Sequence, residues 1–466
     1  MIKFHNTLSG KLEEFKPLRE GEVTLYTCGP TVYDCAHIGN FRTFVFEDLL
    51  RRFLEYKGYK IKHVMNVTDV DDKTIAGAQR ERKALGDFTA TYTQAFNKDL
   101  DTLHILRPTA QPLATAEIPA MVKLIESLIA KGAAYVNDGS VYYRVASFPK
   151  YGNLSKKNLE KNIKGARVDV DEYDKEDGSD FVLWKKAREG EPSWDSPWGK
   201  GRPGWHIECS VMSMKYLGET IDIHAGGEDL IFPHHENEIA QSEAATGKPF
   251  VKYWLHAKHL LVDGEKMSKS KGNFYTLRDL LAKKYKPAEI RYVLLSVHYL
   301  QQLNFTLDGL QAAQNALKDL AQFYSSVINY EVWRRLYSKE NKLESKIRKL
   351  RENIIEALEN DLEVSQALAA IFKFIGETDS QIKKSISKKD HGELLLVLNL
   401  INQIFDVVPD EHYDHFGEEA QKLKMSREVL RKEKRFQEAD ECRQKLYSLG
   451  FLVWDEATGV SGIARM

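Results

Sequence analysis

Residues 1–115 alternate short apolar runs with segments in which apolar side chains recur at helical spacing. The runs VTLYTC (23–28) and IKHVMNV (61–67) predict two strands, and residues 41–58 predict a helix between them. A strand, a helix and a second strand in this order are typical of a parallel βαβ unit. The same rhythm returns over residues 221–256, which predicts an α/β domain built from two separated parts of the chain.

The segment from about residue 117 to residue 200 breaks this rhythm. It begins with a predicted helix over residues 120–131 and continues with the hairpin-like DGSVYYRV (138–145). It ends in a loop rich in Pro, Gly and Trp. A segment of this kind between two halves of an α/β pattern predicts an insertion within the domain.

The segments that follow Gln311 are rich in Ala, Leu, Lys and Glu, and continue to about Phe405 without a convincing strand. They predict a bundle of helices. After Pro409 one further helical stretch is expected over residues 426–449, followed by the strand-like FLVW (451–454). The chain is therefore predicted to end in a small separate domain.

Composition agrees with a protein of several domains, since 42% of the 466 residues are hydrophobic and 29% are charged. Four cysteines are too few for a disulfide scaffold and favour a reducing compartment. The N-terminus does not resemble a secretion signal, and no apolar run approaches the roughly 18–20 residues of a membrane span. We expect a cytoplasmic protein with no membrane partner.

Net charge gives no global sign of nucleic-acid binding, because the formal value is only −1. Residues 421–450 are an exception, with nine Lys or Arg against five Asp or Glu. A local basic excess of this kind is either a solvated helix face or a surface for an anionic partner.

Two segments have the chemistry to hold phosphate. The first, CGPTVYDCAHIGN (28–40), links the first predicted strand to the following helix. The amides at the start of that helix suit a phosphate group, and Gly39 would let a flat base approach the backbone. Turns of this kind are common, however, and His37 would equally suit a buried structural position.

The second segment is KMSKS (266–270), followed by Lys271 and Gly272. Three lysines and two hydroxyl groups within six residues predict a cationic loop. Such a loop can neutralise charge that develops on a departing pyrophosphate. Short basic runs are also common on surfaces without any such role.

The stretch IFPHHENEIA (231–240) contains a candidate metal pair, because His234 and Glu238 are spaced by one helical turn. It does not match the His-Glu-x-x-His pattern of zinc proteases. Two distant cysteines, Cys28 and Cys209, would complete a ligand set that suits zinc. From the spacing alone, a surface His–Glu pair remains the alternative.

The segments CGPTVYD, NVTDVDDK, PGWHIECS, DIHAGGEDLIFPHHENEIAQSEA and KMSKSKGN resemble the cysteinyl-tRNA synthetase family in both order and spacing. This family belongs to the class I aminoacyl-tRNA synthetases, whose paired signatures are a HIGH turn and a KMSKS loop. The HIGH turn reads His37-Ile-Gly-Asn40 here, so the last histidine is replaced. The resemblance implies an α/β fold, with a Rossmann-type parallel-sheet catalytic domain, an insertion, a helical bundle and a small C-terminal domain.

The resemblance also implies domain bounds and site residues. The expected domains are the two catalytic halves (1–116 and 201–255), the insertion (117–200), a KMSKS and stem-contact region (256–310), a tRNA-binding helical bundle (311–405) and an anticodon domain (406–466). The zinc ligands would be Cys28, Cys209, His234 and Glu238, which excludes Cys35, Cys442, His235 and Glu236. ATP would contact His37, Gly39, Asn40, Lys266, Met267, Ser268, Lys269 and Ser270, of which His37, Lys266 and Lys269 would be catalytic. Substrate cysteine would lie against Gly29, Thr68, Trp205, His224 and Asp229, and tRNA against Arg427, Arg431 and Arg443.

The implied reaction joins L-cysteine to ATP-Mg²⁺, releases pyrophosphate, and transfers the cysteine to the terminal ribose of tRNA-Cys. Cysteine and serine differ by one atom, and a shape-based pocket separates such near-isosteres by only a few kcal/mol. Zinc binds thiolate strongly and a neutral hydroxyl poorly, so it would supply the selectivity. A monomer is expected. The alternatives are a cysteine ligase of mycothiol synthesis, which lacks a full anticodon region, a zinc hydrolase, and a tRNA-binding protein without catalysis.

Overall fold

A computed structural model describes most of the chain: residues 1–156, 179–328, 343–382, 386–408, 418–433, 435–449, 451–455 and 461–465. The chain forms two compact units. The first contains residues 1–310 together with 355–367, and the second contains residues 311–354 and 368–466. Each unit is described by itself below.

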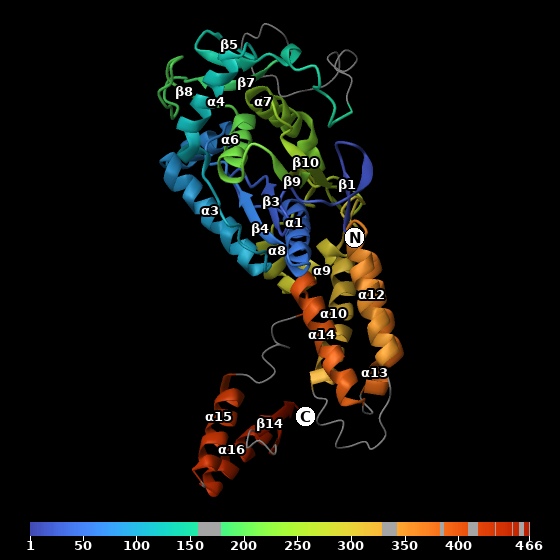
Figure 1. Cartoon of the computed structure of the whole chain (residues 1–466). Coiled ribbons are helices and arrows are strands. Elements are labelled where there is room, and N and C mark those ends of the chain that lie inside the picture. Colours follow the sequence, from blue (N-terminus) through green and yellow to red (C-terminus); the bar gives the residue numbers. More distant parts are fainter. Residues whose placement is uncertain are drawn as a thin grey trace. The chain divides into compact units, whose positions relative to one another are not determined.

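The first unit is built on a four-stranded parallel sheet with strand order β10-β9-β3-β4. Its strands are β3 (Glu22–Thr27), β4 (Lys60–Met65), β9 (Ile221–Gly227) and β10 (Val251–Ala257). Helix α1 (Ile38–Tyr56) connects β3 to β4, so the βαβ prediction is confirmed. The order places β3, from the N-terminal half, directly beside β9, from the later half (Figure 1).

Two further helices carry side chains toward the end of β3. Helix α6 (Trp205–Leu217) precedes β9, and helix α7 (Glu236–Thr246) lies between β9 and β10. Their apolar residues share one core with β3 and β4, in which Ile207, Met212 and Ala240 are buried. Both helices also bury many polar side chains, which is unusual for surface helices of an α/β fold and indicates a polar site inside the unit.

The insertion is an antiparallel sheet with strand order β5-β6-β7-β8. Its elements are α4 (Ile118–Ala130), β5 (Ala134–Asn137), β6 (Ser140–Tyr143), β7 (Phe181–Lys186) and β8 (Gly201–Pro203). The sequence predicted α4 and the β5–β6 hairpin. It missed β7, although this strand has six residues, and it missed β8, which is only three residues long and borders the Pro- and Gly-rich loop. In Figure 1 the insertion lies beside α6 and α7.

The remaining elements of the first unit surround this core. They are β1 (Lys3–Asn6), β2 (Lys11–Glu14), α2 (Asp72–Glu81), α3 (Leu85–Thr102), β11 (Leu261–Val262), α8 (Leu277–Ala282), α9 (Pro287–Leu295) and β12 (Asn304–Phe305). The loop that contains KMSKS follows β11 and forms a short turn at Lys269–Lys271.

The second unit is mainly helical, as predicted. Its elements, some of which begin or end in the first unit, are α10 (Leu307–Ile328), α12 (Glu344–Glu359), α13 (Val364–Ile382), α14 (Lys388–Phe405), α15 (Glu418–Lys432), α16 (Phe436–Ser448), β13 (Phe451–Asp455) and β14 (Ser461–Arg465). The FLVW strand is confirmed as part of β13, which pairs with β14 in an antiparallel hairpin. Among the described helices, none is long and apolar enough to cross a membrane.

The prediction of one continuous helix over residues 426–449 is wrong. The chain turns between α15 and α16, where the Arg435 amide donates to the Leu430 carbonyl over 2.8 Å. The Arg435 side chain also pairs with Glu433 at 3.0 Å and with Glu438 at 2.6 Å. No glycine or proline marks this break, so the sequence contained no ordinary stop signal.

Candidate active site

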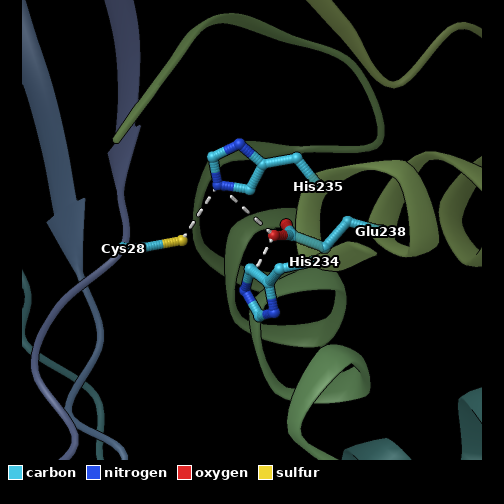
Figure 2. A group of neighbouring side chains, drawn as sticks. All are labelled: Cys28, His234, His235 and Glu238. Carbon is cyan, nitrogen blue, oxygen red and sulfur yellow. Dashed lines mark hydrogen bonds and ion pairs between the residues drawn. The ribbon is translucent and has the colours of Figure 1, made fainter. Parts of the chain in front are cut away.

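A buried cluster of thiol, imidazole and carboxylate groups lies where β3 ends. Cys28 follows β3 directly, Cys209 lies on α6, and Glu238 lies in the first turn of α7. The two sulfur atoms are 3.9 Å apart and belong to free cysteines. Segments separated by about 180 and 30 residues thus contribute to one site, and Figure 2 shows Cys28 pointing from its strand toward the α7 side chains.

His234 and His235 lie in the turn that leads into α7 and are both buried. The helix begins only at Glu236, because Phe232 has extended backbone angles. His234 Nε2 nevertheless lies 3.1 Å from Glu238 Oε1. The predicted one-turn pairing is therefore present, although His234 precedes the regular helix.

Four residues of this cluster each offer a ligand atom within 4.8 Å of all the others: Cys28, His234, His235 and Glu238. The sequence analysis excluded His235, but the structure places its Nε2 3.4 Å from Cys28 Sγ and 3.9 Å from Glu238 Oε1 (Figure 2). Cys209 joins the cluster through its contact with Cys28. Five candidate ligands are thus brought together, one more than the sequence assigned.

A second row of histidines supports the cluster from the neighbouring strands. His235 Nδ1 lies 2.7 Å from His256 Nε2, and His256 Nδ1 lies 2.8 Å from the Thr7 hydroxyl. His224, on β9, lies 3.0 Å from Glu238 Oε2. Such partners fix the orientation of imidazole and carboxylate groups, as outer-shell partners do at metal sites.

Two atoms in the cluster are placed to bind a cation. His234 Nε2 and Glu238 Oε1 are fully buried, and neither makes a hydrogen bond of acceptable geometry. Buried polar atoms are normally satisfied, so two such atoms facing each other beside two thiols call for a shared partner. Sulfur, nitrogen and carboxylate donors around one point suit zinc.

The electrostatics of the cluster favour the ligand forms of two of its residues. Although burial opposes ionisation, the hydrogen bond with Cys28 and the charge of the neighbouring His234 lower the pKa of the Cys209 thiol to about 6. Burial likewise opposes the ionisation of Glu238, but His224 and His234 hold the pKa of its carboxyl at about 2. In contrast, burial and the neighbouring Cys209 raise the pKa of the Cys28 thiol, and against burial Cys209 and Glu238 raise the pKa of His234 to about 10, so these two residues would release protons when a metal binds.

Of the residues predicted to bind substrate cysteine, Trp205 and His224 contact this cluster. The Trp205 ring lies 4.1 Å from the His234 ring and remains 39% exposed, so it forms a solvent-exposed edge of the cluster. The Thr68 hydroxyl is 2.7 Å from Glu208 Oε2, inside the unit. Asp229 lies in the turn after β9, next to Gly227.

Sequence reasoning missed several residues that hold this pocket together. The Gly29 amide donates to Asn66 Oδ1 over 2.9 Å, and Asn66 Nδ2 donates to Thr68 Oγ1 over 3.3 Å. Asn66 and Glu208 belong to the segments NVTDVDDK and PGWHIECS, which carry the resemblance to the family. Nothing in a linear segment, however, shows which neighbours will meet after folding.

The HIGH-like turn caps helix α1. His37 Nδ1 accepts a hydrogen bond from the Asn40 amide at 3.2 Å, and Asn40 Oδ1 accepts one from the His37 amide at 3.1 Å. Burial lowers the pKa of His37. With Nδ1 used as an acceptor, a neutral His37 carries its proton on Nε2 and can donate there. Asn40 thus helps to cap the N-terminus of α1, a structural role that the sequence did not indicate.

The KMSKS loop reaches this turn. The Ile38 amide donates to the Tyr275 carbonyl over 3.0 Å. A methyl group added at Gly39 would lie 2.9 Å from the His37 ring and 3.1 Å from the end of Met267. Within the loop, Ser268 and Ser270 share a hydrogen bond of 2.8 Å. The two phosphate-handling segments predicted from the sequence are therefore adjacent in the fold.

The three predicted tRNA-binding arginines differ in exposure. Arg431 lies over the Phe436 ring at 5.9 Å, and Arg443 lies over the Tyr447 ring at 5.7 Å. The Phe436 side chain is 55% exposed. Arg427, in contrast, is only 1% exposed. A guanidinium buried to this extent cannot reach an RNA phosphate, so the structure does not support the expectation for Arg427.

Comparison with known proteins agrees with this architecture. Residues 14–315 match the family model of the tRNA synthetases class I (C) catalytic domain. Among solved structures, a methionyl-tRNA synthetase of Mycobacterium tuberculosis in complex with methionyl-adenylate superposes with a TM-score of 0.63 at 14% identity, covering 85% of this chain and 94% of that one. The LeuRS of a ternary LeuRS–tRNA–LeuAMS complex from Agrobacterium radiobacter has a TM-score of 0.62 at 11% identity, with 86% of each chain covered.

The fold and the family model together define a class I tRNA synthetase, an enzyme whose substrates are an amino acid, ATP and tRNA. Two curated relatives narrow the assignment. The cysteine–tRNA ligase of Chlamydia muridarum is 50% identical over 473 residues, and that of Solibacter usitatus is 47% identical over 462 residues, with 98% of each chain covered in both cases. This chain belongs to the cysteine–tRNA ligase family.

Proposed function

We propose that this enzyme selects L-cysteine through a zinc ion held by Cys28, Cys209, His234 and Glu238. The observation that carries the proposal is the buried cluster with two unsatisfied atoms, His234 Nε2 and Glu238 Oε1, beside two thiols. When bound, zinc would coordinate the substrate thiolate and discriminate against the hydroxyl of serine. His235 Nε2 lies 3.4 Å from Cys28 Sγ and is a fifth candidate ligand, because its Nδ1 is held by His256 as the second nitrogen of a metal-bound imidazole normally is.

The protein groups around this site would position cysteine for attack on ATP. Trp205 covers the cluster, and Thr68 and Asp229 supply polar groups for the amino acid backbone. The cysteine carboxylate attacks the α-phosphate of ATP-Mg²⁺, which gives cysteinyl-adenylate and pyrophosphate. The terminal ribose hydroxyl of tRNA-Cys then attacks the acyl carbonyl and releases AMP.

The HIGH-like turn and the KMSKS loop would stabilise the negative charge that develops on the phosphates of ATP in the first step. His37 can donate from Nε2 to a phosphate oxygen, and the amides at the start of α1 face the same region. Lys266 and Lys269 would balance the charge of the departing pyrophosphate. Catalysis would thus depend on positioning and charge stabilisation, without a protein nucleophile.

The small C-terminal part would contact tRNA through Arg431, Arg443 and exposed Phe436. Arginines bind phosphates and an exposed aromatic ring can stack on an unpaired base. We also propose that the enzyme acts as a monomer in the cytoplasm, where four free cysteines would remain reduced.

The decisive experiment is cysteine-dependent ATP–pyrophosphate exchange, measured with serine as the competitor substrate and repeated after removal and restoration of zinc. We expect exchange with cysteine only, its loss on chelation, and its recovery with added zinc. Comparable exchange with serine, or full activity in protein shown to be free of metal, would refute the selectivity mechanism. Transfer of labelled cysteine to tRNA-Cys would separate the ligase from an enzyme that passes cysteine to an amino sugar.

A further inference from the structure

Asp34 forms an ion pair with a lysine of the KMSKS loop. It lies between β3 and α1, three residues before His37, and its Oδ2 is 2.6 Å from the Lys269 ammonium. Its other oxygen accepts a hydrogen bond of 2.8 Å from the Cys35 amide, which fixes the direction of the carboxylate. The pair therefore connects the HIGH-like turn to the loop directly.

A second contact holds the same ammonium group. Lys269 Nζ lies 5.1 Å from the centre of the Phe274 ring, within the usual range of a cation–π interaction. The edge of that ring in turn contacts His37, with 5.3 Å between the ring centres. Lys269 is thus held near His37 by an anion on one side and an aromatic ring on the other.

The other predicted phosphate-binding lysine is not held in this way. Lys266 is exposed, and no ion pair with it is found among the residues that the structure describes. Asp34 therefore interacts specifically with the Lys269 ammonium group, and its negative charge does not simply attract every lysine of the loop.

We propose that Asp34 is a positioning residue that holds Lys269 beside His37 in the ATP-free enzyme and is displaced by the phosphates of ATP. The inference rests on the proposed role of Lys269. The triphosphate carries more negative charge than one carboxylate and would compete for the same ammonium group. ATP binding therefore includes the cost of breaking the Asp34–Lys269 pair.

The experiment compares Asp34→Asn with wild type in cysteine-dependent ATP–pyrophosphate exchange. Asparagine keeps the shape and the acceptor for the Cys35 amide but removes the charge. Because both partners are substantially exposed, the pair is a weak one, and we expect the KM for ATP to fall about two- to fivefold. The pair exists only before ATP binds, so kcat and the KM for cysteine should not change.

Glu265→Gln is the matched control, because Glu265 pairs with Lys271 of the same loop at 2.7 Å with similar exposure. This variant should leave the KM for ATP unchanged. In a Lys269→Met background, Asp34→Asn should have no further effect on ATP affinity, measured by equilibrium dialysis if exchange is too slow.

Several results would overturn the inference. These are an unchanged or raised KM for ATP in Asp34→Asn, a loss of kcat instead, or an equal effect in the Lys269→Met background. Absence of cysteine-dependent exchange in the wild type would refute the proposed function itself. An active wild type with an impaired Lys269→Met variant and a silent Asp34→Asn variant would refute only the role of Asp34.

Discussion

Replacing Gly29 by alanine is the sharpest test of how the fold holds the cysteine pocket. A Cβ atom at this position would lie 1.6 Å from the Asn66 carbonyl oxygen and 2.8 Å from its carbonyl carbon. Non-bonded atoms do not approach closer than about 3 Å, so the two backbone segments must separate by at least about 1.4 Å. Neither obstacle is the end of a flexible side chain, so a change of rotamer cannot relieve the overlap.

The cost follows from this displacement. Overpacking of a rigid interior usually costs about 1–3 kcal/mol, and this overlap is with backbone, so we expect about 3 kcal/mol. The displaced segments lie next to Cys28 and Thr68, which belong to the proposed zinc site and the proposed cysteine pocket. A shift of about 1 Å in a reacting group can reduce the rate about 100-fold. Gly29→Ala should therefore lose both stability and cysteine activation.

The assay combines urea denaturation with cysteine-dependent ATP–pyrophosphate exchange. Gly86→Ala serves as the control, because Gly86 lies on α3 with no atom within 4 Å of an added Cβ. Alanine favours a helix over glycine by about 0.5–1 kcal/mol, so the control should be slightly stabilised and fully active. A Gly29→Ala protein within 1 kcal/mol of wild type, with less than a threefold loss of exchange, would refute this reasoning.

Four further predictions concern other parts of the molecule. Gly39→Ala places a methyl group 2.9 Å from an imidazole ring, so the KM for ATP should rise about tenfold or more in exchange assays with little change in the KM for cysteine. Cys209→Ser should lose bound zinc by elemental analysis while Cys442→Ser retains it; equal zinc content in both would contradict the proposed ligand set. Burial lowers the pKa of His63 to about 3, below the roughly 6.5 of an unfolded chain, so the unfolded state takes up the proton first and stability falls as pH drops from 6.5 toward 3. His63→Gln should flatten this dependence by up to about 1.4 kcal/mol per pH unit in urea titrations, and an unchanged slope would count against it. Arg431→Ala should weaken tRNA charging severalfold but leave ATP–pyrophosphate exchange intact, whereas loss of exchange would indicate a folding defect.

The parts of the fold that were predicted correctly are those in which the sequence signal is local. The apolar runs of β3 and β4 and the helical face of α1 each lie within a few residues of one another, so periodicity alone located them. Strand β8 is three residues long and borders a Pro- and Gly-rich loop, so no periodicity could develop. The break before Arg435 is accompanied by side-chain pairs with Glu433 and Glu438, for which the sequence has no distinctive pattern.

In the candidate site, too, the sequence predicted the local contact and missed the contacts between distant segments. The His234–Glu238 spacing indicated a pairing across one helical turn, and these atoms are indeed 3.1 Å apart. The closeness of His235 to Cys28 was not foreseen, because it depends on the packing of α7 against the end of β3. The support from His256 depends on the parallel pairing of β9 and β10, which brings distant strands side by side.

The same buried cluster has a consequence for how the protein is made. Its proposed ligands span 210 residues, from Cys28 to Glu238. At about 5–20 residues per second, a ribosome needs roughly 10–40 s between the first ligand and the last. For most of this interval, until α6 is synthesised, the Cys28 thiol has none of its later partners in α6 and α7. A site with all four proposed ligands can therefore form only after Glu238 has been synthesised, so zinc would be bound late in synthesis or after it.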